Sequence, residues 1–154
     1  MLKEYKVVIT DSSCFIILQK INAIHLLNDL FAVVITTPEI AGEYGFSLPD
    51  WVVIQSVTNL SLQENFKKSV DPGEASAIAL ATEIDYDYLI IDDLEARKFA
   101  EKLGLNVKGS VGVLLSAKQK GFIPLIRPYL DMIQQTNFRI SAKIIQNVLK
   151  AAGE

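Results

Sequence analysis

The sequence predicts an α/β fold, with helices in layers on either side of a mostly parallel, five-stranded central sheet. Short β-branched runs alternate with longer segments of helical periodicity along the 154 residues, and this order is typical of right-handed crossovers in a parallel sheet. The apolar runs contain few alternating polar residues, as expected for strands that are buried on both faces. We therefore expect one three-layer α/β/α domain spanning residues 1–154.

The first predicted strand ends in an acid followed by two hydroxyl side chains. Residues 7–9 are all β-branched, and Asp11, Ser12 and Ser13 follow directly. Because ligands of open α/β sheets bind beyond the carboxyl ends of the strands, Asp11 lies where chemistry is expected. The alternative is that Asp11 or Ser12 only caps the helix that begins near Cys14.

The rest of the chain continues the alternation of strands and helices. Four further apolar runs predict strands over residues 31–35, 51–54, 88–91 and 105–107. Apolar or alanine spacing, together with start and stop signals, predicts helices over residues 15–30 with a break near Asn22, 37–45, 59–68, 71–84, 94–103, 109–121, 123–135 and 141–151. Proline in the first turn marks two of the helix starts, and Gly104 marks a helix end.

The composition excludes several classes of protein. The single cysteine, Cys14, excludes an internal disulfide, and the single histidine, His25, leaves no imidazole cluster for zinc. A net charge of −3 is unlike the basic surface of a general nucleic-acid coat protein, so work on nucleic acid would need a cation. No apolar run reaches the ~18 residues of a membrane helix. The charged start, residues 1–6, is neither a signal peptide nor a transit peptide, so we expect a cytoplasmic protein without membrane contact.

Four sites combine an acid with a place at the carboxyl edge of the predicted sheet or facing it: Asp11, Glu43, Glu74 and the pair Asp92 and Asp93. Taken singly, each has a structural alternative: a helix cap, an exposed helix position or a capping box. If the strands that end at Asp11 and Asp92 are neighbours, their carboxylates repel each other unless a cation is present. Carboxylates without histidine or thiolate suit Mg²⁺ or Mn²⁺, which can activate water for attack on a phosphodiester.

The order of these motifs resembles the PIN domain family. The segments that carry the resemblance are VVITDSS, TPEIAGE, DPGEASAIALA and LIIDDLEARKFA, beginning at residues 7, 37, 71 and 89. A prokaryotic branch of unknown function also shares GSVGVLLSAKQKG, which begins at residue 109. The resemblance covers nearly the whole chain and implies a Mg²⁺- or Mn²⁺-dependent ribonuclease, often the toxin of a toxin–antitoxin pair.

Carried over residue by residue, the resemblance makes Asp11, Glu43, Glu74 and Asp92 the metal-binding and catalytic acids. Many PIN domains have Thr-x-Asp in the last motif, whereas this chain has an isoleucine followed by two aspartates. Asp93 is therefore a second candidate ligand in that motif, and Asp92 is favoured because it ends the strand.

Other polar residues are candidates for supporting roles. Ser12 or Ser13 would hold a metal ligand or a water molecule. Arg97, one turn past Asp92, and Lys118, in the glycine-flanked helix, would steady a scissile phosphate. For both of these basic residues, the alternative is an exposed helix charge.

The expected partners are an RNA substrate, a small antitoxin protein and a second copy in a homodimer. The last helix has an apolar side that could pack on its own sheet, dock to a second copy or accept another partner. The competing hypothesis is a PIN-like nucleic-acid-binding or regulatory module with little or no nuclease activity. A receiver-type phosphoacceptor is excluded because no acid follows the predicted strand 51–54, and a haloacid-type phosphatase would need an aspartate in place of Ser13.

Overall fold

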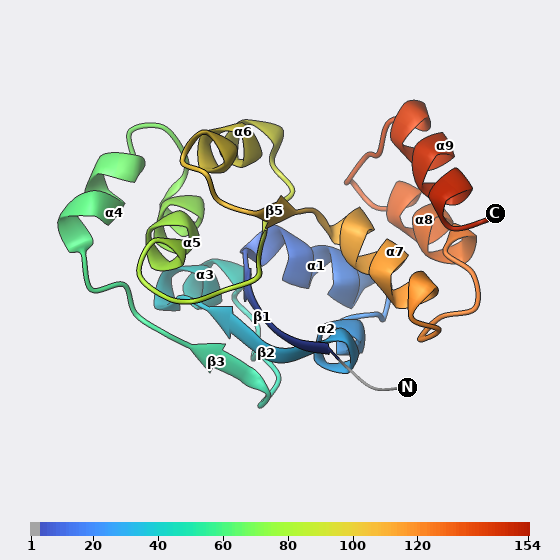
Figure 1. Ribbon diagram of the computed structural model, residues 1–154, viewed down its shortest axis with the longest axis horizontal. Helices are drawn as coiled ribbons and strands as arrows, with labels where there is room; N and C mark the ends of the chain where they lie inside the picture. The colour runs from blue at the N-terminus through green and yellow to red at the C-terminus, as the bar shows by residue number, and fades with distance from the viewer. Residues whose placement is uncertain (1–3) are drawn as a thin grey trace.

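A five-stranded sheet, in which every strand is parallel to its neighbours, forms the centre of the computed structural model, which describes residues 4–154 (Figure 1). The strands are β1 (Glu4–Thr10), β2 (Phe31–Thr36), β3 (Val52–Ile54), β4 (Tyr88–Ile90) and β5 (Val107–Lys108). Their order across the sheet is β3-β2-β1-β4-β5, so β1 is central. Helices flank the sheet, and the predicted α/β class with five strands is confirmed. The predicted start at residues 1–3 lies outside the described residues.

Each helix follows a strand or another helix in the order that the sequence predicts. The helices are α1 (Ser12–Lys20), α2 (His25–Leu30), α3 (Pro38–Tyr44), α4 (Leu60–Phe66), α5 (Pro72–Ala81), α6 (Leu94–Lys102), α7 (Ser110–Gln119), α8 (Arg127–Gln134) and α9 (Ala142–Ala151). Helix α1 contacts α3 and α7, while α5 packs against β1 and β4. Helices α4 and α9 lie at opposite ends of the longest axis (Figure 1). None of the helices within the described part of the chain is both long and apolar enough to cross a membrane.

The register of the central strands brings the carboxyl ends of β1 and β4 together. Thr10 pairs with Ile90, and the Asp11 N–H donates to the Ile90 carbonyl at 3.0 Å. On the other side of β1, the Thr36 hydroxyl donates to the Thr10 carbonyl at 2.8 Å. The strands that precede Asp11 and Asp92 are therefore neighbours, which is the arrangement in which their carboxylates are expected to repel each other.

Of the two forms predicted for residues 15–30, one kinked helix or two short ones, the structure has two helices, because Asn22 adopts a left-handed conformation with φ of 55° between them. Other predicted boundaries are corrected. The helix predicted to begin at residue 123 begins at Arg127 instead, with Pro128 in its first turn. The last strand is 107–108 rather than 105–107, since the Leu105 N–H closes the end of α6 on the Ala100 carbonyl.

The apolar core includes the neighbouring strands β1 and β4 and the helix α5 that packs on them. Val8, Ile9, Leu89 and Ile90 are fully buried, as expected for β-branched and leucine residues in strands that are covered on both faces. The alanines of α5 are also buried, and their small side chains let this helix pack closely on β1 and β4. This rigid centre positions the residues that follow β1 and β4.

Candidate active site

Asp11 lies at the carboxyl end of the central strand and is buried, with only 3% of its surface exposed. It occupies the N-cap position of α1 but makes no side-chain capping hydrogen bond. Its Oδ1 atom is buried and has no hydrogen-bond partner among the described residues. The capping alternative therefore does not account for this acid.

The surroundings of Asp11 disfavour its charge. Burial raises its pKa to about 7, the Ser12 backbone N–H opposes this shift, and the carboxylates of Asp71, Glu43 and Asp92 add to it. An acid that is both desolvated and repelled by three others holds a proton well above the usual range of aspartate. A positive charge placed here would relieve both effects.

Glu43 reaches the cluster from α3. The Ser12 hydroxyl donates to Glu43 Oε2 at 3.1 Å, so one of the two predicted supporting serines contacts a predicted acid. Burial, followed by the charge of Asp71, raises the pKa of Glu43, while the Ser12 hydroxyl and the Gly73 backbone N–H lower it. Position 73 has no room for a side chain, because a Cβ there would collide with the Glu43 carboxylate.

Glu74 forms the capping box considered for it and is also buried among the acids. It forms a capping box at the start of α5, where its N–H donates to Asp71 Oδ1 at 2.8 Å and its Oε1 accepts from the Asp71 N–H at 3.2 Å. Yet only 6% of it is exposed. Burial raises its pKa to about 8; the Asp71 N–H opposes the shift, and the charges of Asp71, Asp11 and Asp93 add to it. Glu74 therefore belongs electrostatically to the same acidic group.

The two adjacent aspartates after β4 have different surroundings. Asp92 Oδ1 accepts from the Ser110 N–H at 2.8 Å and Oδ2 accepts from the Ser110 hydroxyl at 2.6 Å, so α7 fixes its orientation. Burial raises the pKa of Asp92, whereas Ser110 and the positive charge of Arg97 lower it. Asp93 is exposed, and its Oδ2 caps α6 by accepting from the Ala96 N–H at 2.9 Å.

The sequence did not predict that three further residues belong to the site. Asp71, expected only as a helix cap, raises the pKa of Asp11, Glu43 and Glu74 by its charge. Gly73, beside it, leaves space for Glu43. Ser110, expected only in the turn that begins a helix, holds both oxygens of Asp92. The DPGE and GS segments were visible in the sequence, but their contacts depend on which strands are neighbours.

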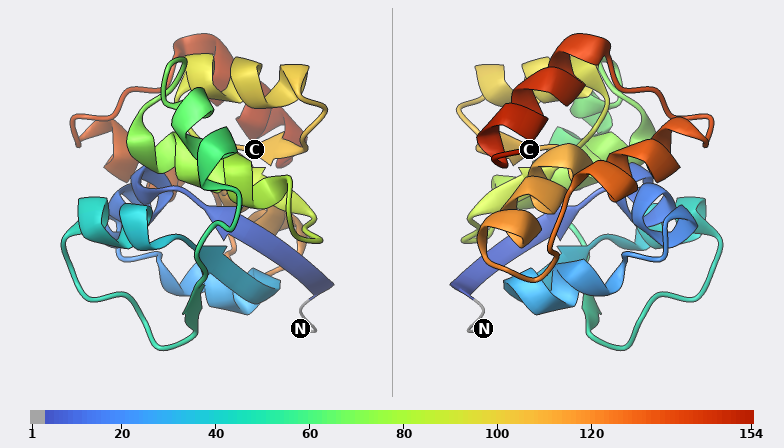
Figure 2. Two further views of the ribbon diagram at one scale, coloured as in Figure 1. Left: turned by 90° about the vertical axis from the view of Figure 1, so that its left-hand side faces the viewer. Right: turned by 90° about the vertical axis from the view of Figure 1, so that its right-hand side faces the viewer.

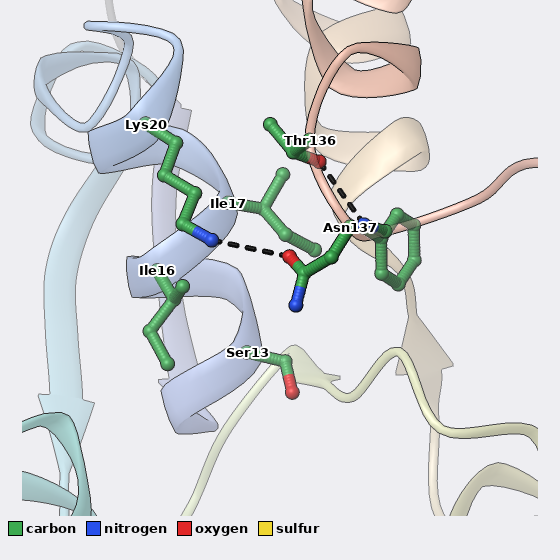
Figure 3. A pocket seen from close by; sticks show the side chains of 7 residues that line it. Ser13, Ile16, Ile17, Lys20, Thr136 and Asn137 are labelled. Carbon is green, nitrogen blue, oxygen red and sulfur yellow. Dashed lines mark hydrogen bonds between the residues drawn. The ribbon is translucent and has the colours of Figure 1, made fainter.

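The structure places the other predicted residues around or away from the acids. Ser13 lines a separate small pocket of about 160 Å³ between α1 and residues 136–138, across which Lys20 Nζ donates to Asn137 Oδ1 at 3.1 Å (Figure 3). Arg97 lies beside Asp92, and its Nε atom is buried without a partner among the described residues. Lys118 is near the far end of α7, where its amine lies 3.3 Å from Glu154 Oε2. The structure does not bring Lys118 to the acids.

The donor chemistry of the site fits a divalent cation. Carboxylates from four segments, at Asp11, Glu43, Glu74 and Asp92, interact electrostatically, and Asp71 reinforces them. Oxygen donors without histidine or thiolate match Mg²⁺ or Mn²⁺, and the unpartnered Asp11 Oδ1 is an available donor. Across residues 4–154, however, no three acidic, histidine or cysteine side chains are already arranged as a metal cage.

Comparison with known families bears on the same residues. A family model described as a PIN domain matches residues 7–154, which include all four acids and the groups that support them. The resemblance seen in the sequence is thereby confirmed. Among curated proteins, none matches the chain.

Proposed function

Since the chain belongs to the PIN domain family, whose members are generally nucleases, we propose that it is a Mg²⁺- or Mn²⁺-dependent endoribonuclease that hydrolyses RNA phosphodiesters. The observation that carries the proposal is the state of Asp11, a buried acid with an unpartnered oxygen and a pKa of about 7 among other carboxylates. Such an arrangement destabilises a fold unless it serves a bound cation.

Asp11, Glu43, Glu74 and Asp92 would hold the ion. When bound, a divalent ion lowers the pKa of water and stabilises negative charge on the leaving oxygen of a phosphodiester. The residues of the chain prepare this site before substrate arrives. Ser110 orients both oxygens of Asp92, and the Ser12 hydroxyl directs Glu43 toward the end of β1. Asp93 caps α6, so its contribution is to position the segment that carries Asp92.

Arg97 would contact the RNA backbone. Its guanidinium lies next to Asp92 and lines the surface beside it, and the side chain is only half-buried, so its charge can face a phosphate oxygen. A guanidinium binds phosphate oxygens strongly, and such a contact stabilises charge that develops during cleavage. Lys118 is left out of this role, because its amine is paired with Glu154.

The biological setting is also a proposal. Family membership supports a toxin role in the cytoplasm, neutralised by a small antitoxin protein. Family membership likewise supports a protein contact, either with the antitoxin or with a second copy in a homodimer. Sedimentation of the purified chain over a range of concentrations tests the homodimer. A small reading frame beside the gene would support the antitoxin, and its absence would oppose the toxin role.

The ribonuclease proposal is tested by incubating single-stranded and structured RNAs with Mn²⁺ and the wild-type protein, Asp11→Asn or Asp85→Asn. Asp85 is an exposed acid at the opposite, amino end of β4, so its substitution is a matched control. We expect cleavage by wild type and by the control, and none by Asp11→Asn, whose fold is checked by circular dichroism. Equal cleavage by Asp11→Asn would show that another site or a contaminant cuts RNA. No cleavage by any protein would favour the alternative, a PIN-like binding or regulatory module.

A further inference from the structure

A groove of about 660 Å³ opens beside the acidic site, between α7 and α9. Its walls are mainly apolar and are formed by Val107, Val111, Leu115, Ile140, Ile144 and Val148. The two helices contact each other, and both lie at the end of the molecule opposite α4 (Figures 1 and 2). This α7–α9 groove has the volume of sites that bind small organic ligands, which span about 300–1,000 Å³.

The α7–α9 groove is continuous with the candidate active site. Asp92 and Arg97 line its wall, and Ser110, which holds Asp92, begins the helix that forms one side of the groove. A phosphodiester placed at Asp92 would thus have one of its neighbouring nucleosides at the mouth of the groove.

The charges and polar groups around the groove suit a nucleotide. Arg97, Lys108 and Arg139 line it, so positive charge borders an apolar cavity in a chain whose net charge is −3. The side chain of Lys108 is fixed by its amine, which lies 3.1 Å from the Ser116 hydroxyl and 4.2 Å from the centre of the Tyr88 ring, two residues that do not line the groove. Asn147 offers an amide donor and acceptor on the α9 side, as the edge of a nucleobase requires.

We propose that the α7–α9 groove is a base-binding subsite, in which a nucleobase adjacent to the scissile phosphate lies between Val111 and Leu115 of α7 and Ile144 and Val148 of α9. This inference rests on the proposed ribonuclease function and adds to it the residues that select the substrate. Apolar walls bury the flat faces of the base, and Asn147 reads its edge. A base held in a duplex cannot enter the groove without leaving its partner.

The first test is binding, followed by amide chemical shifts of the isotope-labelled full chain with Mg²⁺ present. The probes are adenosine 5′-monophosphate, uridine 5′-monophosphate and ribose 5-phosphate, the last of which lacks a base. We expect the two nucleotides, and not ribose 5-phosphate, to shift the amides of Val111, Leu115 and Asn147. Ile144→Trp should abolish these shifts by filling the groove. Leu60→Trp, an exposed leucine on the distant α4, should retain them.

The second test separates base recognition from bond cleavage. Ile144 is half-exposed, so tryptophan at this position leaves the core unchanged. Filling an apolar pocket costs about tenfold or more in kcat/KM for a ligand that needs it. We therefore expect Ile144→Trp to lose about that much on RNA while it cleaves a base-free diester, the same RNA with an abasic ribose beside the scissile phosphate, at the wild-type rate.

Each outcome decides between defined alternatives. Equal shifts from ribose 5-phosphate, or equal loss of RNA and base-free diester hydrolysis, would overturn the base subsite. So would the absence of nucleotide shifts in a protein that cleaves RNA, and in that case the ribonuclease proposal stands. Shifts at the same amides that follow protein concentration instead of nucleotide would assign the groove to a second copy and overturn the inference. If wild type cleaves neither substrate, the ribonuclease proposal fails, and the nucleotide shifts still decide the subsite.

Discussion

At the scale of single residues, Asp11 has the least favourable environment for its charge. The side chain is buried, its Oδ1 has no partner among the described residues, and its pKa is raised to about 7 by burial and by neighbouring carboxylates. In water the same group would ionise near 3.8. Keeping such an acid therefore lowers the stability of the protein at neutral pH, which is the pattern expected of a functional site and not of a core position.

Ser110 is predicted to tune the site without contacting substrate. Ser110→Ala removes the hydroxyl that donates to Asp92 Oδ2 but keeps the backbone N–H on Oδ1. We expect the affinity for Mn²⁺ to fall about 10–100-fold, as for other groups that orient a metal ligand. Titration with Mn²⁺, followed by calorimetry, measures the change. Ser116→Ala, on the same helix, is the control, and equal losses in both variants would contradict the role of Ser110.

Gly73 is predicted to be needed for cleavage, because it leaves space for the Glu43 carboxylate. A Cβ at this position collides with the far end of the Glu43 side chain, which can swing away, so Gly73→Ala should displace the carboxylate without unfolding the protein. Because alanine favours helices over glycine, stability should be unchanged or higher by up to about 1 kcal/mol. RNA cleavage should fall about tenfold to a hundredfold, as for a misplaced group.

Gly42→Ala provides the matched comparison for this prediction, since a Cβ at Gly42 meets nothing within 4 Å. Thermal melting and cleavage rates are measured on both variants. Normal cleavage by Gly73→Ala would show that Glu43 need not occupy its present position.

At this scale, the sequence identified the acids but not their contacts. Asp11 and Asp92 were recognisable because each follows an apolar run, and Glu43 and Glu74 because their motifs resemble those of a known family. Asp92 is held by Ser110, whereas Asp93 caps α6. The sequence could not predict this difference, because Ser110 is 18 residues away from Asp92. Lys118 pairs with Glu154 and so does not reach the acids. This too is a long-range contact, which no local sequence pattern predicts.

At the scale of elements, Glu83 fastens the start of α4 to the end of α5. Its carboxylate accepts from the Asn59 N–H at 2.7 Å, from the Thr58 N–H at 3.0 Å and from the Thr58 hydroxyl at 2.8 Å. Burial alone would raise the pKa of Glu83, but these hydrogen bonds outweigh it and lower the pKa below its usual value of 4.5. A connection between two helices is therefore sensitive to pH.

The sign of the pH effect follows from this lowered pKa. The folded protein binds the Glu83 proton less tightly than the unfolded chain, so the stabilisation is present above pH 4.5 and is lost as pH falls through the folded value. Glu83→Gln should destabilise the protein by about 1 kcal/mol at pH 6, and the difference from wild type should shrink below pH 4.5.

Urea unfolding at several pH values, with Glu64→Gln of α4 as a control, measures the difference. Glu64 is exposed and pairs only with a neighbouring lysine one turn away, so its loss should be nearly neutral. A wild-type and Glu83→Gln difference that does not vary with pH would contradict this account.

The elements themselves were largely predictable, and their exact ends were not. Proline and capping residues marked the starts of α3 and α5 correctly, because these signals act within one turn. The helix predicted over 123–135 begins later than its apolar pattern indicates, at Arg127, and Pro128 in its first turn is the local signal of that start. Asn22 was recognised as a break, but only its left-handed backbone decides that two helices result.

At the scale of the whole molecule, a bound cation should stabilise the fold. The wild-type protein is expected to melt higher by roughly 5–10 °C in Mn²⁺ at a hundred times its dissociation constant. Asp11→Asn should melt higher than wild type in chelator, because a repelled buried charge is gone, and should not respond to Mn²⁺. Asp85→Asn should behave as wild type. A wild-type melting temperature that is indifferent to Mn²⁺ and Mg²⁺ would count against a metal site.

The arrangement of the sheet explains what sequence reasoning could not decide. Parallel strands were predictable from the alternation of strands and helices, but the order β3-β2-β1-β4-β5 was not. That order places β4 directly beside β1, and only then do Asp11 and Asp92 meet. The sequence could therefore predict the acidic cluster only if these two strands were neighbours, and the structure shows that they are.

The central place of β1 has a consequence for the timing of synthesis. The ribosome makes β1 first, yet its neighbour β4 exists only after residue 90 has been added, and the helix that secures Asp92 begins at Ser110. Pairing between such distant segments forms late, because a long loop must close first. A nascent chain therefore carries Asp11 without Asp92 beside it until β4 has been made, and the cluster is complete only once synthesis has passed residue 110.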